Sequence, residues 1–169
     1  MSDSKNRLAL VALGSNLGDS AALIRDAFAR LEKLSTAPFR KSSLWQTTPV
    51  DCPPGSPPFV NAAVAFTPLP GATPESLLAK LLALEKEFGR RPKVVMNEPR
   101  PLDLDLIAFG CETRNTPALV LPHPRAHLRR FVLQPLSEVA PEFVLPGQSL
   151  TIRSLLILLP PDDDMRRLA

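Results

Sequence analysis

Hydrophobic positions along the chain follow two periods, which predict both strands and helices. The run at 7–13, RLALVAL, is apolar on both faces of a strand, which is typical of the centre of a sheet. The runs at 59–66 and 102–109, FVNAAVAF and LDLDLIAF, also carry strand patterns. A weaker alternation at 39–47, FRKSSLWQT, predicts a further strand.

Apolar residues at helical spacing predict two helices between these strands. The first begins near Asp19, with Asp19 or Ser20 as its cap. The second opens at Thr73 and Pro74 and ends before Gly89, because proline suits a first turn and glycine suits the position after a last turn. The expected buried stripes are Leu23, Ala27, Leu31 and Leu34 in the first helix, and Leu77, Leu81, Leu84 and Phe88 in the second.

Two irregular segments separate these elements. Residues 48–58, TPVDCPPGSPP, contain five prolines, so neither a helix nor a strand can continue there. At about eleven residues this loop is long enough to act as a lid. A second loop at 90–101 is basic. The shorter elements predicted beyond it are a strand at 118–121, a helix at 131–139 and a last helix at about 152–159.

The order β-α-β-β-α-β predicts the α+β class. The expected architecture is a ferredoxin-like split β-α-β antiparallel sheet with helices packed on its faces, plus C-terminal additions. The 169 residues, 44% hydrophobic and 22% charged, suit one globular domain. We expect this domain to span 1–169, with a core at about 7–146 and a flexible tail at about 160–169.

Composition argues against several classes of protein. No run approaches the roughly 20 apolar residues of a membrane span. The N-terminal stretch MSDSKNRLALVALGSN has a polar lead and a short apolar run, which favours a strand over a signal peptide. Cys52 and Cys111 are too few for a disulfide framework and lack metal-ligand spacing. The sequence therefore predicts a cytoplasmic protein with no membrane partner.

Positive charge gathers in one part of the chain. The formal net charge is only +3, which says little about partners. Arginine recognises phosphate and carboxylate through paired hydrogen bonds. A solvated surface position is the favoured explanation for any single arginine, but the cluster beside two carboxylates favours an anionic ligand. The seven arginines of this region are Arg90, Arg91, Arg100, Arg114, Arg125, Arg129 and Arg130.

Asp103 and Asp105 lie two residues apart in a predicted strand, within this basic region. Their side chains share one face, with Cα atoms about 7 Å apart. Such a pair can hold hard cations about 3.5–4 Å apart, as in two-metal phosphoryl-transfer sites, and Mg²⁺ accepts one or two carboxylates with water and phosphate as its other ligands. The alternative is the polar face of an edge strand. Arg100, just before the pair, favours the phosphate-linked hypothesis.

Three other features are candidates for binding. The stretch GSNLGD is not a P-loop, because Asp19 stands where that motif needs lysine; its glycines allow either a close approach to a flat ligand or a plain turn. Phe59 and Asn61 share a strand face, so Asn61 is either a structural amide or one that pairs with a heterocycle beside a stacking ring. His123 and His127 lack a third metal ligand, which favours hydrogen bonding to phosphate.

Together these motifs resemble the 6-hydroxymethyl-7,8-dihydropterin pyrophosphokinase family of folate biosynthesis, from the first strand to about residue 146. The segment PRPLDLDL with LPHPR downstream is the most specific part of the resemblance. The matching segments are ALGSNLGD (12–19), FVNAAVAF (59–66), LLALEKEFGR (81–90), PRPLDLDLIAFG (99–110) and LPHPRAHLRRFVLQPLSEVAP (121–141).

The resemblance implies a transferase that moves the pyrophosphoryl group of ATP to the hydroxymethyl oxygen of the pterin and releases AMP. ATP would be the co-substrate, two Mg²⁺ ions would be bound, and the protein would act as a monomer without a nucleic-acid partner. Asp103 and Asp105 would hold both ions, and Asp103 would also lie nearest the attacking hydroxyl.

The resemblance also implies roles for other residues. The catalytic-loop arginines would be Arg90 and Arg100. The pterin would lie between Phe59 and Phe131, with hydrogen bonds from Asn61, Asp103 and the backbone at Thr47 and Val50. ATP would be lined by Glu85, Arg90, Lys93, Arg100, Leu106, His123 and Arg129.

The loop at 90–100 departs from the family pattern. Many members carry GRxR followed by RWGPR, whereas this chain has GRRPKVVMNEPR. Pro92, Met96, Asn97 and Glu98 replace two arginines, a tryptophan and a glycine of that pattern. Two alternatives to an active enzyme therefore stand: a pseudoenzyme that binds both substrates without turnover, and a non-catalytic nucleic-acid-binding module on the same type of sheet.

Overall fold

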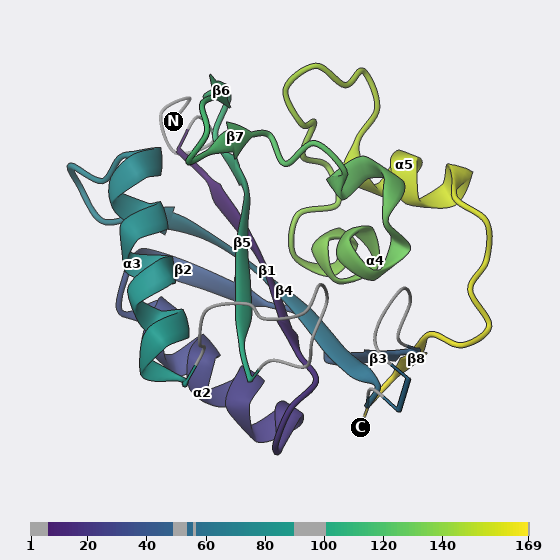
Figure 1. The fold of residues 1–169 in the computed structure, drawn as a ribbon. Coiled ribbons are helices and arrows are strands. Elements are labelled where there is room, and N and C mark those ends of the chain that lie inside the picture. Colours follow the sequence, from purple (N-terminus) through teal and green to yellow (C-terminus); the bar gives the residue numbers. More distant parts are fainter. Residues whose placement is uncertain (1–6, 49–53, 56, 90–100, 169) are drawn as a thin grey trace.

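The structure, a computed structural model, describes residues 7–48, 54–55, 57–89 and 101–168. Its centre is an antiparallel sheet in the order β5-β1-β4-β3-β8, and β2 also pairs with β4 (Figure 1). This arrangement confirms the predicted α+β class. The strands are β1 (Ala9–Ser15), β2 (Ser35–Lys41), β3 (Trp45–Thr47), β4 (Phe59–Pro68), β5 (Asp103–Phe109) and β8 (Arg166–Arg167).

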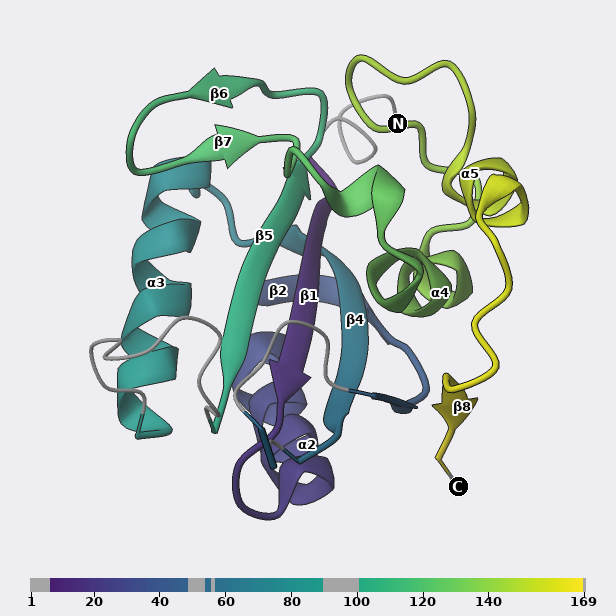
Figure 2. The ribbon, with the colours of Figure 1, turned by 45° about the vertical axis from the view of Figure 1, so that its right-hand side comes forward.

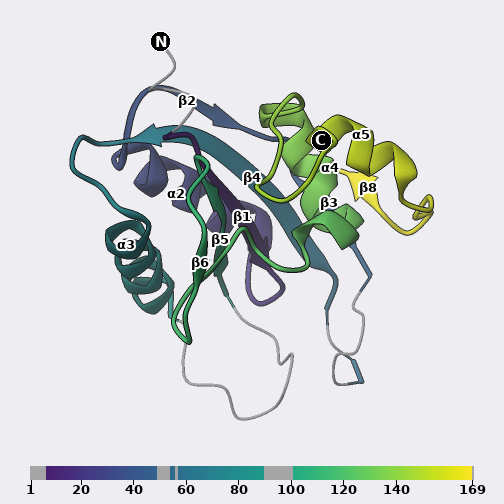
Figure 3. The same cartoon turned by 90° about the horizontal axis from the view of Figure 1, so that it is seen from above.

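Helices cover both faces of the sheet. In Figure 2, α3 lies on one side of the strands and α4 and α5 lie on the other. Figure 3 shows the same separation of α3 from α4 from above. The helices are α2 (Ser20–Glu32), α3 (Pro74–Glu87), the 3-10 turn η1 (Ala126–Leu128), α4 (Arg130–Val139) and α5 (Ile152–Leu158).

Each face of the sheet has its own apolar core. Val11 and Leu13 of β1 pack in the cluster that includes α2 and α3. Leu10, which points the other way, belongs to the cluster that includes α4 and α5. Burial on both faces explains why this strand is a continuous apolar run, since alternate side chains enter different cores.

The predicted single strand at 39–47 is wrong: the structure has two strands there. Both β2 and β3 pair with β4, and between them residues 42–44 face only residues 62–63 of β4, so the regular pairing is interrupted by one extra residue. The hydroxyl of Ser42 accepts a hydrogen bond from the backbone N–H of Ala63 at 2.8 Å, while the N–H of Ser42 donates to the carbonyl of Ala63 at 2.9 Å. A side chain thus substitutes for a backbone acceptor, which keeps the chain in contact with β4 where the regular pairing is interrupted.

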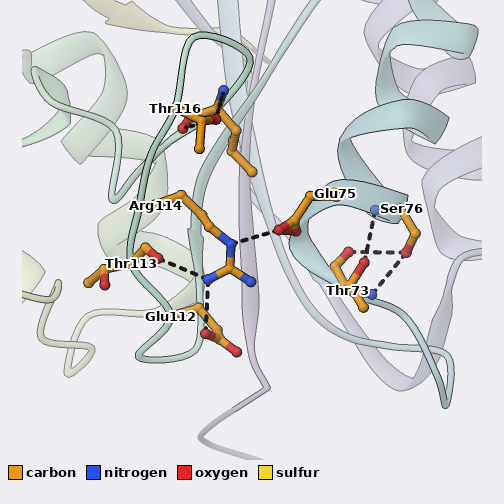
Figure 4. Close-up of polar contacts among 8 residues, drawn as sticks. Thr73, Glu75, Ser76, Glu112, Thr113, Arg114 and Thr116 are labelled. Atoms are coloured by element: carbon orange, nitrogen blue, oxygen red, sulfur yellow. Dashed lines mark hydrogen bonds and ion pairs between the residues drawn. The ribbon is translucent and has the colours of Figure 1, made fainter.

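The predicted helix caps are confirmed. The Asp19 carboxylate accepts a hydrogen bond from the N–H of Ala22 at 3.2 Å. Thr73 and Ser76 form a reciprocal capping box, with hydrogen bonds of 3.1 and 2.9 Å (Figure 4). Gly89 follows α3 with φ +94°, a conformation that favours glycine.

A small hairpin, β6 (Arg114–Asn115) with β7 (Val120–Leu121), is anchored to the start of α3. The prediction at 118–121 found only its second strand. Arg114 donates from Nε to Oε1 of Glu75 at 2.7 Å and from Nη1 to Oε2 of Glu112 at 3.1 Å (Figure 4). The hydrogen bond from Arg114 lowers the pKa of the Glu75 carboxyl. The hairpin leads into the turn that carries His123.

The C-terminal segment is tied to the domain at two places. The guanidinium of Arg130 donates to the carbonyls of Leu159 and Pro160, each at 2.9 Å. Further along, β8 pairs with β3, and the N–H of Leu168 donates to the carbonyl of Leu44 at 2.8 Å. The tail predicted to be flexible therefore contains a short edge strand.

Across the described ranges, no helix has the length and apolar character needed to span a membrane.

Arg130→Met should lower the free energy of unfolding by about 1–2 kcal/mol, because two carbonyls at the end of α5 lose a charged donor while the apolar stem is kept. The expected drop in Tm is about 2–6 °C in thermal unfolding. Arg153→Met is the matched control, since the Arg153 side chain forms an exposed ion pair with Glu142 at 2.9 Å. Equal Tm values for the two variants would contradict the anchoring role.

Candidate functional site

Strand register brings three predicted residues into one row. Gly14 of β1 pairs with Asn61 of β4 on one side and with Asp103 of β5 on the other. Residues paired in this way share a face, and neighbouring strands lie about 4.8 Å apart. The amide and the carboxylate therefore flank a position that has no side chain.

The next row along the sheet is Ala63, Ala12 and Asp105. Ala63 and, two residues beyond Asp105, Ile107 belong to the core under α4 and α5. Figure 2 shows the lower ends of β1, β4 and β5 extending past α4. The polar row thus lies on the helix-covered face, just beyond the edge of its apolar core.

Gly14 forms the floor of the row. A Cβ atom placed there would lie 3.5 Å from Oδ1 of Asn61 and 3.9 Å from Cδ1 of Phe59. Asn61 Oδ1 and the Phe59 ring therefore both face the space above Gly14. Glycine keeps that space open for a flat ligand approaching the backbone.

Asn61 is held in a fixed orientation. It is 6% exposed, and its Nδ2 donates to Oγ1 of the buried Thr47 at 2.9 Å. This hydrogen bond compensates for the burial of two polar side chains. Because Nδ2 is directed at Thr47, Oδ1 is directed at Gly14. The two interpretations of Asn61 are therefore compatible, since a structural hydrogen bond orients the amide for a ligand.

Asp103 and Asp105 are half-buried, whereas Leu104 between them lies in the core. The backbone N–H of Leu104 points away from β1 and donates to Oε2 of Glu85 at 2.7 Å. Glu85 is itself 6% exposed and belongs to α3. A helix carboxylate thus fixes the outer edge of β5 at the residue that separates the two aspartates.

The two aspartates fit Mg²⁺ better than a metal enclosed by protein ligands. Among residues that the structure describes, no group of three or more His, Cys, Asp or Glu could hold a metal ion. Mg²⁺ keeps several waters and takes one or two carboxylates together with phosphate oxygens of a substrate. Two half-buried carboxylates on one strand face provide that type of donor set.

His123 follows the hairpin and is held through both its backbone and its ring. Its N–H donates to the carbonyl of Ile107 at 2.8 Å. Its Nδ1 accepts a hydrogen bond from the N–H of Arg125 at 3.1 Å, which assigns the ring proton to Nε2. Burial lowers the pKa of His123, the positive charges of Arg129 and Arg125 lower it further, and Asp103 opposes them. The neutral ring can donate from Nε2.

Phe131 lies in the first turn of α4 and is 40% exposed, although a phenylalanine is a core residue by default. The guanidinium carbon of Arg129 lies 5.5 Å from the centroid of its ring. This cation–π contact holds together an aromatic ring and an arginine that the sequence predicts to face different ligands.

The remaining predicted residues have different outcomes. The Leu106 side chain is buried in the α2/α3 core, so a ligand contact from this residue would involve its backbone at the outer edge of β5. Val50, Arg90, Lys93 and Arg100 lie outside the described residues. Among the contacts that sequence reasoning missed is the one from Trp45 to Glu138 at 2.7 Å. Nothing in the sequence pairs those two residues.

Comparisons with known proteins agree with the motifs. Residues 10–141 match the family described as 7,8-dihydro-6-hydroxymethylpterin-pyrophosphokinase (HPPK). The chain is 36% identical to a 2-amino-4-hydroxy-6-hydroxymethyldihydropteridine pyrophosphokinase of Synechocystis sp., over 88% of this chain and 74% of that protein. It is 38% identical to the protein of that name from Pseudomonas aeruginosa, over 80% of this chain and 82% of that protein.

Some relatives are much longer. The chain is 35% identical to the folic acid synthesis protein fol1 of Pneumocystis carinii, and the match covers 88% of this chain but only 20% of that protein. The fold resembles that of the Plasmodium falciparum HPPK-DHPS solved with pteroate, with a TM-score of 0.71 and 14% identity. That match covers 95% of this chain and 47% of the longer one.

We expect the His123 ring to titrate below pH 6.5 and to carry its proton on Nε2 when neutral, both measurable by NMR of the ring nitrogens. Because its pKa is lowered on folding, the neutral ring contributes stability above the unfolded pKa of about 6.5, and this stability is lost as pH falls through the folded pKa. His123→Gln should flatten the pH dependence of the free energy of unfolding. His127→Gln removes the NMR signals of the other histidine, so the remaining ring signals belong to His123. A proton on Nδ1 would contradict the assignment.

Proposed function

The chain belongs to the 7,8-dihydro-6-hydroxymethylpterin-pyrophosphokinase family, and from that membership we propose how its residues perform the reaction. The enzyme transfers pyrophosphate from ATP to the hydroxymethyl group of 6-hydroxymethyl-7,8-dihydropterin in folate biosynthesis, and AMP is released.

The pterin is proposed to lie above Gly14. Oδ1 of Asn61 faces this space and can accept hydrogen bonds from the amino and ring N–H groups of a pterin. Phe59 stacks on one face of the heterocycle and Phe131 of α4 covers the other. The backbone at Thr47 and Val50 completes the edge. The row of Asn61, Gly14 and Asp103 across three strands is the single observation that carries this proposal.

Asp103 and Asp105 are proposed to hold two Mg²⁺ ions together with the phosphates of ATP. The ions supply charge neutralisation along the triphosphate during transfer. Asp103 has a second role, because it shares the row of Gly14 and Asn61 and therefore lies closer to the pterin than Asp105 does. From there its carboxylate can orient the attacking hydroxyl or accept its proton.

The nucleotide is proposed to bind on the other side of the aspartates. His123 donates from Nε2 to phosphate. The charges of Arg129 and Asp103 both act on its pKa, which supports a place for the ring between the aspartates and the nucleotide. A ring that stays neutral at pH 7 keeps its tautomer, so the donor is always directed the same way. The other residues proposed to line ATP are Glu85, Arg90, Lys93, Arg100, Leu106 and Arg129.

Transfer itself needs little covalent chemistry from the protein. The pterin row fixes the hydroxymethyl oxygen, and the nucleotide side fixes the phosphorus that it attacks, so the groups react in line. Arg90 and Arg100 are proposed to stabilise the negative charge that develops on the transferred group. We propose that the enzyme acts as a monomer in the cytoplasm, where ATP is supplied.

Purified protein with Mg²⁺, ATP and the pterin tests the proposal. AMP that forms only when the pterin is present supports it, whereas ADP would mean a one-phosphate kinase. Binding of both substrates without AMP would identify a pseudoenzyme and direct attention to the loop at 90–100. Failure to bind either substrate, together with salt-sensitive RNA binding, would favour the nucleic-acid alternative.

Asp105→Asn should reduce AMP formation by at least about 10²-fold, because the metal pair loses a carboxylate ligand while the shape of the side chain is kept. Chromatography of the nucleotide products measures the loss. Asp163→Asn, in the exposed C-terminal segment, is the control and should retain wild-type activity. A folded Asp105→Asn variant with full activity would refute the metal role.

Gly14→Ala should weaken pterin binding while raising the free energy of unfolding. The added methyl fits without a steric clash, since its nearest neighbour is 3.5 Å away, and replacing a strand glycine should stabilise the fold by about 0.5–1 kcal/mol. The same methyl occupies the floor of the proposed pterin pocket, so the Kd for the pterin should rise about tenfold or more while that for ATP is unchanged. Calorimetric titration and thermal unfolding measure the two effects. Unchanged pterin affinity would place the pterin elsewhere.

A further inference from the structure

We propose that Glu138 is a positioning residue that sets the distance between Phe131 of α4 and Asn61 of β4, which line two sides of the proposed pterin pocket. It acts through Trp45 and Ser43 and does not touch the substrate. The inference rests on the proposed function, because it concerns where Phe131 stands relative to Asn61.

Both oxygens of the Glu138 carboxylate accept hydrogen bonds, one from Trp45 at the start of β3 and one from Ser43 in the segment between β2 and β3. Oε1 accepts a hydrogen bond from Nε1 of Trp45 at 2.7 Å. Oε2 accepts one from Oγ of Ser43 at 2.8 Å and a longer one from the N–H of Ser43 at 3.4 Å. Hydrogen bonds to an ionised acceptor are stronger and more directional than neutral ones. The carboxylate therefore fixes this end of α4 at a defined place.

Because Glu138 and Phe131 belong to the same helix, fixing Glu138 also fixes the position of Phe131. Phe131 and Glu138 are seven residues apart in α4, which is close to two full turns. They therefore project from the same side of the helix, about 10 Å apart along its axis. A rotation or a slide of α4 that moved Glu138 would move Phe131 by a similar amount.

Strand pairing relates the position of Glu138 to that of Asn61. Trp45 pairs directly with Asn61, and Thr47, on the same strand face as Trp45, accepts the hydrogen bond that orients the Asn61 amide. Glu138 thus contacts β3, the strand that pairs with β4 beside Asn61 and whose Thr47 orients the Asn61 amide. One continuous path of contacts joins Phe131 through α4, Glu138 and β3 to Asn61.

Apolar packing alone would not define this spacing. Under α4 the sheet presents small side chains, including Ala63, Ala65 and Ala108. Burial of apolar area is not directional, and small residues present few ridges that resist sliding. At the other end of the helix, Arg130 is bound to the carbonyls that follow α5 and not to the sheet. The Glu138 contacts are therefore the directional link between α4 and β3 among the described residues.

Three variants test the inference, with the pterin and an ATP analogue titrated separately. Glu138→Ala should raise the Kd and KM for the pterin about 5–20-fold while kcat at saturation and the Kd for the ATP analogue stay within about twofold. Glu138→Gln should recover part of the loss, because its remaining oxygen can still accept from Trp45. Trp45→Phe should weaken pterin binding, and its effect should be less than additive with Glu138→Ala.

Glu142→Ala provides the matched control, since this exposed acid lies just beyond α4 and contacts Arg153. It should leave the pterin Kd unchanged. The chain has a single tryptophan, so the indole N–H of Trp45 gives one NMR signal that reports the contact directly. That signal should shift in Glu138→Ala and not in Glu142→Ala.

The outcomes separate this inference from the proposed function. If the wild-type protein binds the pterin and Glu138→Ala binds it equally well, the positioning role is wrong and the proposed function stands. If the Kd values for pterin and ATP analogue rise together with a fall in Tm, Glu138 has only a structural role. If the wild-type protein does not bind the pterin, the proposed function fails and this inference fails with it.

Discussion

The antiparallel pairing of β1 with both β4 and β5 is the constraint on which the site depends. It places Asn61, Gly14 and Asp103 in one row and directs their positions to the same face of the sheet. A shift of one residue in either pairing would turn the amide or the carboxylate into the opposite core. The apolar side chains on both faces of β1 oppose that shift, because they must enter two different cores.

The same sheet is divided into a stabilising part and a binding part. Toward one end, α4 and α5 cover small apolar side chains, and the row beyond them is polar and partly open. Polar residues there are held by contacts from outside the row: Thr47 orients Asn61, and Glu85 holds the backbone between the aspartates. Contacts of this kind let a site keep its geometry before a ligand binds.

The arginines around the site also differ in what they do: some act on His123, and one stabilises the fold. Burial lowers the pKa of His123, the positive charges of Arg129 and Arg125 lower it further, and Asp103 opposes them, so the neutral ring is favoured. Arg130, between Arg129 and Phe131 in the sequence, points away from the site and binds the end of α5. Of these consecutive residues, Arg130 stabilises the fold, while Arg129 and Phe131 are the ones proposed to face the nucleotide and the pterin.

Much of the fold could be predicted because its elements have local signals. The caps at Asp19 and Thr73 and the alternation at 102–109 need only neighbouring residues to specify them. The strand at 39–47 was predicted wrongly because its interruption at 42–44 depends on pairing with β4, including a hydrogen bond between Ser42 and Ala63, which are distant in sequence. The sequence by itself determined the fold class and the family and identified the two aspartates as candidate metal ligands, since periodicity and short motifs carry these signals. Only the tertiary structure decided that Gly14 separates Asn61 from Asp103 and that Glu138 reaches Trp45, because strand register and helix placement arise from packing between segments that no local pattern relates.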